Sequence, residues 1–357
     1  MADIFITHKC NLNCSYCFSK EHVNKCSDEI SIENFIKLVD FNKTERGERL
    51  GIVGGEPSRH SKFKEIIQII KNDDEVEHCV IFSNGIELGK FAEDFNHPKF
   101  NFLLNCNSSR DIGNARFEKM KKSIEALYNV NKQFNLGVNL YSLDLDYSFI
   151  FDLLKMTDKH ELRFSFAIPN SIKEEEKDVF KCFEKAKPFL NKFFKDCFEH
   201  EVVPHNDCNA IPPCIMNDED KKLQVHSAVL ARKYDIHSNL IESTNTCNPI
   251  ITIFPNMCAT RSMCYPHCEK VPVENFANID HLRKYLYKTV DIYSDMSFFK
   301  EECKTCRLRI IEKCGVCKVY KLKQAEELKK YVMNRSCAAC SSRKNIFDKI
   351  FKIQAGS

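Results

Sequence analysis

Three cysteines near the N-terminus have a spacing that suits metal chemistry. Cys10, Cys14 and Cys17 stand in the run CNLNCSYC, with three residues between the first pair and two between the second. Three thiolates on one tight loop can ligate three irons of a four-iron four-sulfur cluster and leave the fourth iron open to another ligand. The alternatives are three structural thiols, or a partial zinc site with His8 as a candidate fourth ligand.

A second set of cysteines lies in the last third of the chain. Of the twenty cysteines, ten fall between Cys247 and Cys340. The N-terminal run MADIFITHKC has none of the features of a secretory signal, so we expect a cytoplasmic protein whose thiols stay reduced. Metal binding is then the leading use of these cysteines, and zinc is one alternative because two C-x2-C pairs are a common zinc spacing.

The elements that must position these residues alternate along the first 170 residues. Six apolar runs are typical of strands, and helical patterns separate them. The strand-like runs cover residues 3–7, 50–57, 78–85, 101–107, 136–142 and 161–169, and the helical patterns cover 31–42, 62–72, 90–96, 117–130 and 147–156. This alternation predicts repeated βαβ units and an α/β fold with a parallel sheet, either an open doubly wound sheet or a barrel.

The distribution of apolar, charged and cysteine residues suggests how the chain is divided into domains. We expect a barrel over residues 1–170, a connecting segment with a charged helix over 171–240, and a small cysteine-rich domain over 241–357 that metal helps to order. The net charge of +3 indicates no nucleic-acid partner. No apolar run approaches the ~20 residues that a membrane-spanning helix needs.

A second motif strengthens the interpretation of the N-terminal cysteines. Gly54, Gly55, Glu56 and Pro57 end the second predicted strand, and Tyr16 places an aromatic residue before the last cysteine of the triplet. Together these residues resemble the signature of the radical S-adenosylmethionine (SAM) superfamily. Glycines let a backbone approach a ligand, and a carboxylate can accept hydrogen bonds from an ammonium group.

The resemblance implies a partial (β/α)6 TIM-like barrel with its site at the carboxyl ends of the strands. SAM would chelate the open iron through its amino and carboxylate groups, and the Gly-Gly-Glu motif would meet the amino group. The implied cofactor-binding residues are Tyr16, Gly54, Gly55, Glu56, Ser83, Asn84, Asn105, Asn107, Asn139 and Arg163.

The C-terminal cysteines resemble the SPASM extension of radical SAM enzymes, which binds two auxiliary four-iron four-sulfur clusters. The resemblance therefore implies three clusters in all. The auxiliary ligands would be Cys247, Cys264 and Cys317, with Cys214 or Cys208, for one cluster, and Cys303, Cys306, Cys314 and Cys337 or Cys340 for the other. The sequence departs from the extension in its intervals, and Cys258 and Cys268 are surplus.

The implied function is that of a radical SAM oxidoreductase or peptide maturase. SAM would be cleaved reductively to a 5′-deoxyadenosyl radical, which abstracts hydrogen from a ribosomally made peptide that is crosslinked or otherwise modified. A flavodoxin or ferredoxin would donate the electron. A leader would be recognised by a separate protein or by residues 171–240, or there would be no leader recognition. The alternatives are a radical dehydrogenase of a small alcohol or sugar, and a non-catalytic iron–sulfur or zinc protein. No catalytic acid or base can be named from the sequence.

Overall fold

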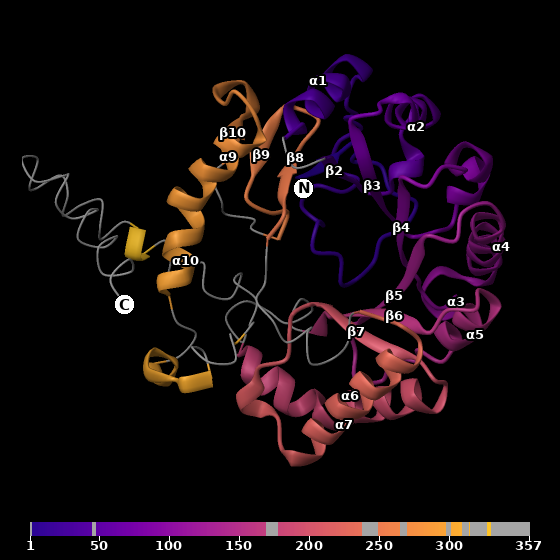
Figure 1. The fold of residues 1–357 in the computed structure, drawn as a ribbon, viewed down its shortest axis with the longest axis vertical. Coiled ribbons are helices and arrows are strands. Elements are labelled where there is room, and N and C mark those ends of the chain that lie inside the picture. Colours follow the sequence, from indigo (N-terminus) through magenta and orange to yellow (C-terminus); the bar gives the residue numbers. More distant parts are fainter. Residues whose placement is uncertain are drawn as a thin grey trace, which may run out of the picture.

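The computed structural model describes residues 2–44, 48–168, 178–237, 249–264, 270–297, 301–308, 314 and 327–329. Within this part of the chain, one sheet has ten strands in the order β10-β9-β8-β1-β2-β3-β4-β5-β6-β7. All neighbours from β8 to β7 run parallel, whereas β9 pairs antiparallel with both β8 and β10. The sheet curves into an open barrel with the helices outside (Figure 1).

Six strands lie where the apolar runs predict them. They are β1 (Ala2–Phe5), β2 (Glu48–Val53), β3 (Val76–Ser83), β4 (Phe100–Asn105), β5 (Phe134–Leu140) and β6 (Glu161–Phe166). The sheet continues on both sides with β7 (Val203–Cys208), β8 (Ile251–Ile253), β9 (Cys258–Thr260) and β10 (Val271–Pro272). The expected connecting segment thus supplies a parallel strand, β7, which pairs with β6.

The helices follow the strands in the expected alternation. Those of the barrel are α1 (Ile32–Asn42), α2 (Phe63–Asn72), α3 (Ser109–Ile112), α4 (Asn114–Val130), α5 (Phe149–Met156), α6 (Val179–Glu199) and α7 (Asp218–Lys233). The helix expected near residues 90–96 is a 3-10 helix, Leu88–Phe95. Ser31 caps α1 because its hydroxyl accepts a hydrogen bond from the Asn34 amide at 3.1 Å.

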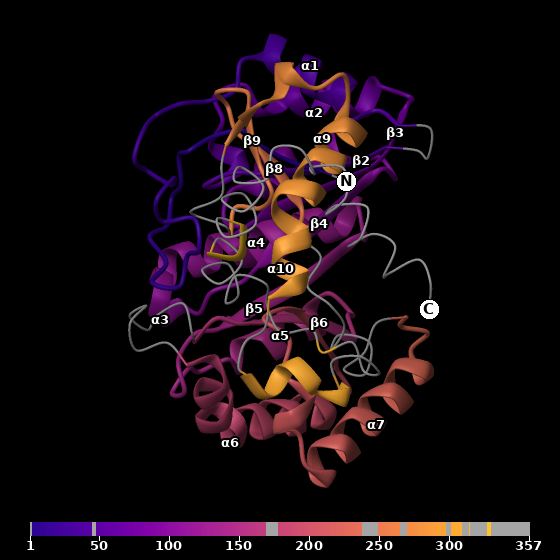
Figure 2. The same ribbon diagram turned by 90° about the vertical axis from the view of Figure 1, so that its left-hand side faces the viewer.

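The open side of the barrel is flanked by two later helices. Figure 2 shows α9 (Ile279–Leu286) and α10 (Ile292–Met296) running one after the other along that side. Arg261, just after β9, joins these helices to the β8–β9 pair. Its Nε lies 2.8 Å from both carboxylate oxygens of Asp291, which lies between α9 and α10. No helix in the described ranges is long and apolar enough to cross a membrane.

The core lies between the strands and the outer helices. Along β4, the side chains of Phe100, Phe102 and Leu104 are fully buried, and the Phe95 ring packs 4.8 Å from that of Phe102. Burying one such side chain contributes roughly 1.5–3 kcal/mol. The alternate residues of the same strands face the inside of the barrel, where the cysteine loop lies at the carboxyl ends of β1 and β2.

Candidate active site

The cysteine triplet lies on the long loop that follows β1. Cys10, Cys14 and Cys17 are half-buried, and the Cys17 amide donates to the Cys14 carbonyl at 3.2 Å. The Cys10 amide donates to Asn24 Oδ1 at 2.8 Å, and Leu12 is buried beneath the loop. The loop is therefore folded by its own hydrogen bonds and held to the barrel by an apolar side chain.

Burial keeps these thiols protonated when no metal is bound. It raises the pKa of Cys10 to about 12, and it also raises the pKa of Cys14 and of Cys17. Binding iron would therefore release protons. No three His, Cys, Asp or Glu side chains of the described residues converge closely enough to hold a single metal ion. The prediction that these three thiols ligate three irons of a four-iron four-sulfur cluster therefore stays a prediction.

The two glycines at the end of β2 are needed because that strand end touches the cysteine loop. The Gly55 amide donates to the Thr7 carbonyl and the Glu56 amide to the Lys9 carbonyl, each at 2.8 Å. A Cβ on Gly55 would lie 2.5 Å from Lys9 O, and one on Gly54 would lie 2.8 Å from Thr7 O. Both distances are shorter than any real contact, so the glycines let the motif cross-link the loop that carries the thiols.

Glu56 is fully buried and connects the ends of β2 and β3. Its carboxylate accepts hydrogen bonds from the Ser83 hydroxyl at 2.9 Å, the Asn84 amide at 2.9 Å, and both the hydroxyl and the amide of Ser58. Burial raises the pKa of this carboxyl, and these hydrogen bonds only partly offset the effect. Four protein donors already occupy the carboxylate, so its predicted contact with an ammonium group stays a prediction.

Asn84 carries this connection back to the cysteine loop. Its Nδ2 donates to Asn11 Oδ1 at 2.7 Å, and Asn11 lies between the first two cysteines. The Nδ2 of Asn11 is buried and has no partner in the described part of the chain. An unpartnered donor beside the thiols is suited to an acceptor of a bound group. Sequence reasoning missed Asn11, which only this contact reveals.

An aromatic pair lies beside Cys14. The rings of Tyr16 and Tyr141 stack with centroids 4.8 Å apart and an interplanar angle of 24°. The Tyr16 hydroxyl donates to Asn107 Oδ1, and that of Tyr141 donates to Asp111 Oδ1. Asn107 follows the end of β4, Asp111 lies in α3 and Tyr141 follows β5, so these contacts join the cysteine loop to the far side of the barrel mouth. Tyr141 and Asp111 were not among the predicted site residues.

A row of inward-facing residues crosses the far wall of the barrel. Register pairs Asn105 with Gly137, Gly137 with Arg163, and Arg163 with His205. A Cβ on Gly137 would meet Asn105 Oδ1 and Arg163 Nη1 at 3.4 Å, an ordinary contact distance. Gly137 therefore leaves a space about one methyl group wide that two polar side chains border.

Arg163 is the most buried charge in this row. Its Nη2 pairs with the half-exposed Asp207, whose pKa stays low because the guanidinium outweighs the effect of burial. Its Nε and Nη1, like Nδ1 of His205, are buried without a partner among the residues that the structure describes. Buried donors are normally satisfied, so this wall is suited to a bound polar group.

The auxiliary-cluster candidates are only partly described. Cys264 follows β9, Cys303 and Cys306 lie in and beside the short 3-10 helix Glu301–Thr305, and Cys214 is exposed near α7. Cys208, at the end of β7, and Cys314 are half-buried. Outside the described residues lie Cys247, Cys317, Cys337 and Cys340, and the surplus Cys268. Both auxiliary ligand sets therefore stay predictions.

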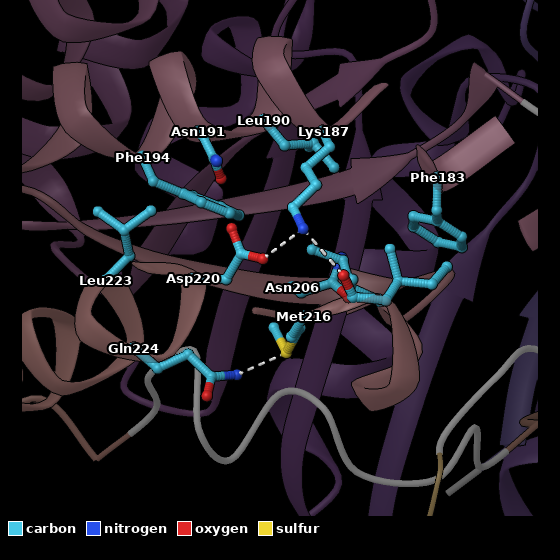
Figure 3. Close-up of a pocket in the computed structure, with 12 residues that line it drawn as sticks. Phe183, Lys187, Leu190, Asn191, Phe194, Asn206, Met216, Asp220, Leu223 and Gln224 are labelled. Atoms are coloured by element: carbon cyan, nitrogen blue, oxygen red, sulfur yellow. Dashed lines mark hydrogen bonds and ion pairs between the residues drawn. The ribbon is translucent and has the colours of Figure 1, made fainter. Parts of the chain in front are cut away.

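A cavity between α6, α7 and β7 is separate from this site (Figure 3). Lys187 lies on its wall, paired with Asp220 at 2.8 Å and donating to the Ile215 carbonyl at 3.0 Å. The volume of the cavity is about 30 Å³. That is room for roughly two water molecules, since one needs about 10–15 Å³. The cavity cannot hold SAM.

Comparison with known proteins supports the interpretation of the N-terminal half. Residues 4–146 match the family model of the Radical SAM superfamily. The chain is 30% identical over 159 residues to a probable GTP 3′,8-cyclase of Methanococcus vannielii, covering 42% of this chain and 53% of the relative. It is 26% identical over 179 residues to the GTP 3′,8-cyclase of Clostridium perfringens, covering 46% and 54%. The chain thus spans about half the length of these curated relatives.

Solved structures resemble the chain over more of its length. Native anSMEcpe with bound AdoMet and Cp18Cys peptide aligns with a TM-score of 0.61 and 15% identity, over 94% of this chain and 97% of that one. Streptococcus suis SuiB bound to precursor peptide SuiA aligns with a TM-score of 0.53 and 13% identity, over 90% and 70%. At these identities the likeness shows a shared fold.

Proposed function

We propose, starting from the radical SAM domain that residues 4–146 form, that this chain cleaves SAM and modifies a peptide. The observation that carries the first part is the three-thiol loop cross-linked to Gly55 and Glu56. When bound, a four-iron cluster ligated by SAM supplies the electron that breaks a C–S bond of SAM and so starts hydrogen abstraction.

The residues of the chain would bind and orient the group. Cys10, Cys14 and Cys17 would ligate three irons, and the backbone of residues 54–56 would hold the loop that carries them. Asn11 Nδ2, the space over Gly137, and the two free nitrogens of Arg163 fit a ligand with several polar atoms. The stacked ring of Tyr16 would cover the Cys14 side of the site and exclude water there.

Two different observations bear on the substrate. The structures named above contain peptides and align with nearly the whole described barrel and beyond it, which favours a peptide. The curated relatives are GTP 3′,8-cyclases, which makes a nucleotide the second candidate. We favour the peptide because the curated matches extend over less than half of this chain, whereas the structural alignments include the region that carries the later cysteines.

The remaining parts of the proposal follow from the cysteines. We propose two auxiliary clusters in the region after residue 241, an electron donor such as a flavodoxin or ferredoxin, and a cytoplasmic location that keeps the thiols reduced. Fully reconstituted protein should then hold on the order of twelve irons, at four per cluster. Stoichiometric zinc with about four irons would contradict the auxiliary clusters alone.

The first experiment tests SAM cleavage. Anaerobically reconstituted protein with dithionite and SAM should release 5′-deoxyadenosine, and Cys14→Ala should release none. Cys26→Ala, which removes an exposed cysteine outside the triplet, is the matched control and should behave like the wild type. A fully iron-loaded wild type that forms no 5′-deoxyadenosine would refute the proposal.

The second experiment separates the substrates. Candidate peptides deuterated at the carbon to be attacked, and GTP deuterated at its ribose, are each incubated with enzyme and SAM. Deuterium recovered in 5′-deoxyadenosine from a peptide supports the proposal. Transfer from GTP alone would replace the peptide by a nucleotide, and transfer from a small alcohol or sugar alone would indicate a dehydrogenase.

A further inference from the structure

The Tyr16 hydroxyl has more neighbours than it can serve with one proton. Two partners can accept this proton, the amide oxygen of Asn107 and the sulfur of Cys14, whereas the Asn139 amide donates to the phenol oxygen. A phenol has one proton to donate and can accept through its oxygen. In the metal-free chain the proton goes to Asn107 Oδ1. The thiol of Cys14 is the competing acceptor.

Binding of iron would change which acceptor is preferred. Cys14 would then be a thiolate, and hydrogen bonds to charged acceptors are roughly twice as strong as those between neutral groups. The Asn107 side chain can turn its amide and donate to the phenol oxygen instead of accepting from it. In that arrangement the Tyr16 hydroxyl donates to the Cys14 sulfur, and the Asn107 amide donates to the Tyr16 oxygen.

The position of Tyr16 is fixed by residues from two strand ends. Tyr141, directly after β5, stacks on the Tyr16 ring. Its hydroxyl donates to Asp111, which also accepts from the Ser108 hydroxyl at 2.8 Å and so joins Tyr141 to the N-terminus of α3. Tyr141 thus holds the Tyr16 ring from the side opposite the cysteine loop.

We propose that the Tyr16 hydroxyl donates a hydrogen bond to the Cys14 sulfur when that sulfur ligates iron, and that Tyr141 is the positioning residue that holds it there. This inference rests on the proposed N-terminal cluster. Hydrogen bonds to cluster sulfurs raise the reduction potential, because they stabilise the more negative reduced state. Tyr16 therefore adjusts how readily the cluster accepts its electron.

The test measures the midpoint potential of the N-terminal cluster by redox titration followed by electron paramagnetic resonance, without substrate. Three predicted auxiliary ligands, Cys303, Cys306 and Cys314, are replaced by Ala in every variant, so that the signal of one predicted auxiliary cluster is removed. Tyr16→Phe removes only the hydroxyl and should lower the potential. Asn107→Ala changes the same loop contact but keeps the Tyr16 hydroxyl, so the potential should stay close to the wild-type value. The contrast between the two variants distinguishes the hydrogen bond to sulfur from a general disturbance of the loop.

Tyr141 is tested through its effect on Tyr16. Tyr141→Leu removes the stacked ring and should lower the potential in the wild-type background, yet change nothing further in Tyr16→Phe, since both act through one hydrogen bond. Tyr141→Phe retains the ring and should restore most of the potential. Tyr234→Phe is the matched control, because it removes a tyrosine hydroxyl bonded to Glu201, far from the loop, and should leave the potential unchanged.

An unchanged potential in an iron-loaded Tyr16→Phe would overturn the inference while leaving the proposed function intact. If Tyr16→Phe loses the cluster, Asn107→Ala and Tyr141→Leu still test the inference. An equal lowering of the midpoint potential in these two variants would overturn it. A wild type that assembles no N-terminal cluster would instead refute the proposed function.

Discussion

Glycines on the β1–β2 side of the barrel lie where neighbouring atoms leave no room for a side chain, whereas Gly137 on β5 lies where a methyl group would fit. A Cβ on Gly51 would lie 2.0 Å from Asp3 Oδ1, and one on Gly55 would lie 2.5 Å from a carbonyl oxygen. On Gly137 the shortest contact would be 3.4 Å. The first side is closely packed around Asp3 and the cysteine loop, whereas an added methyl group on Gly137 would make only ordinary contacts.

Gly55→Ala should have the largest effect, because it breaks the packed side. The carbonyl of Lys9 is backbone and cannot yield easily, so the loop must move away from β2. Displacement of a reacting group by about 1 Å can cost about 100-fold in rate, and we expect at least that loss in 5′-deoxyadenosine formation. Iron analysis should show that the N-terminal cluster is not retained. Normal iron content and rate would show that the close contact is not needed.

Asp3→Asn tests a charge buried on the same side. Burial raises the pKa of Asp3 to about 7 from 3.8, and its Oδ1 has no partner in the described ranges. The folded state therefore favours the protonated form, so stability falls as the pH rises from about 4 to 7. Between pH 5 and 7 the wild type should lose about 3 kcal/mol relative to Asp3→Asn, at about 1.4 kcal/mol per unit.

Thermal unfolding of the two proteins across this pH range checks the prediction. The melting temperature of Asp3→Asn should exceed that of the wild type increasingly toward pH 7 and level off above it. Parallel melting curves at every pH would show that Asp3 is ionised in the folded state at all of them.

Gly137→Ala tests the open side. The added methyl makes only ordinary contacts, and alanine in a strand is favoured over glycine by roughly 0.5–1 kcal/mol, so the melting temperature should be equal or slightly higher. The methyl narrows the space beside Asn105 and Arg163, so we expect about a tenfold lower rate of 5′-deoxyadenosine formation or a raised KM for SAM, worth ~1.4 kcal/mol. Unchanged kinetics would mean that nothing binds over Gly137.

Arg163→Met should have the smallest effect on stability. It removes two unpartnered buried nitrogens and leaves behind Asp207, which is only partly buried, so the loss of unfolding free energy should stay below the roughly 3–5 kcal/mol of a fully buried unpaired charge. Arg261→Met is the contrasting control. It leaves Asp291 buried and unpaired, and such a loss costs about 3–5 kcal/mol. Equal melting temperatures of the two variants would contradict the prediction that losing Arg261 destabilises the fold more than losing Arg163.

Local patterns predicted the strands well, and the fold brings the two predicted motifs into contact. Apolar runs marked β1 to β6, and the cysteine spacing with Gly54, Gly55 and Glu56 identified the loop and its neighbour. In addition, a side chain on Gly54 or Gly55 would meet the backbone of Thr7 or Lys9, a constraint that the motif alone does not reveal. Sequence alone cannot show which segments a strand end meets, so the physical reason for these glycines became visible only in the folded chain.

Residues that act through long-range contacts were missed. β7 has a proline and several polar residues and therefore no alternating pattern, yet it pairs with β6 and brings His205 and Asp207 to Arg163. Tyr141 and Asn11 carry no motif, and their roles depend on contacts with residues far along the chain. Neither spacing nor periodicity reports such contacts, because both are properties of neighbouring positions.

The pairing of β8 with β1 has a consequence for synthesis on the ribosome. β1 can pair with β2 as soon as residue 53 has emerged, but its other edge is completed only by Ile251–Ile253. At about 5–20 residues per second, roughly 200 residues of delay amount to on the order of ten seconds or more. During that time the strand that leads into the cysteine loop has an unpaired edge, which can recruit another chain. Chains that stop before residue 251 should therefore aggregate through β1, however complete their cysteine triplet is.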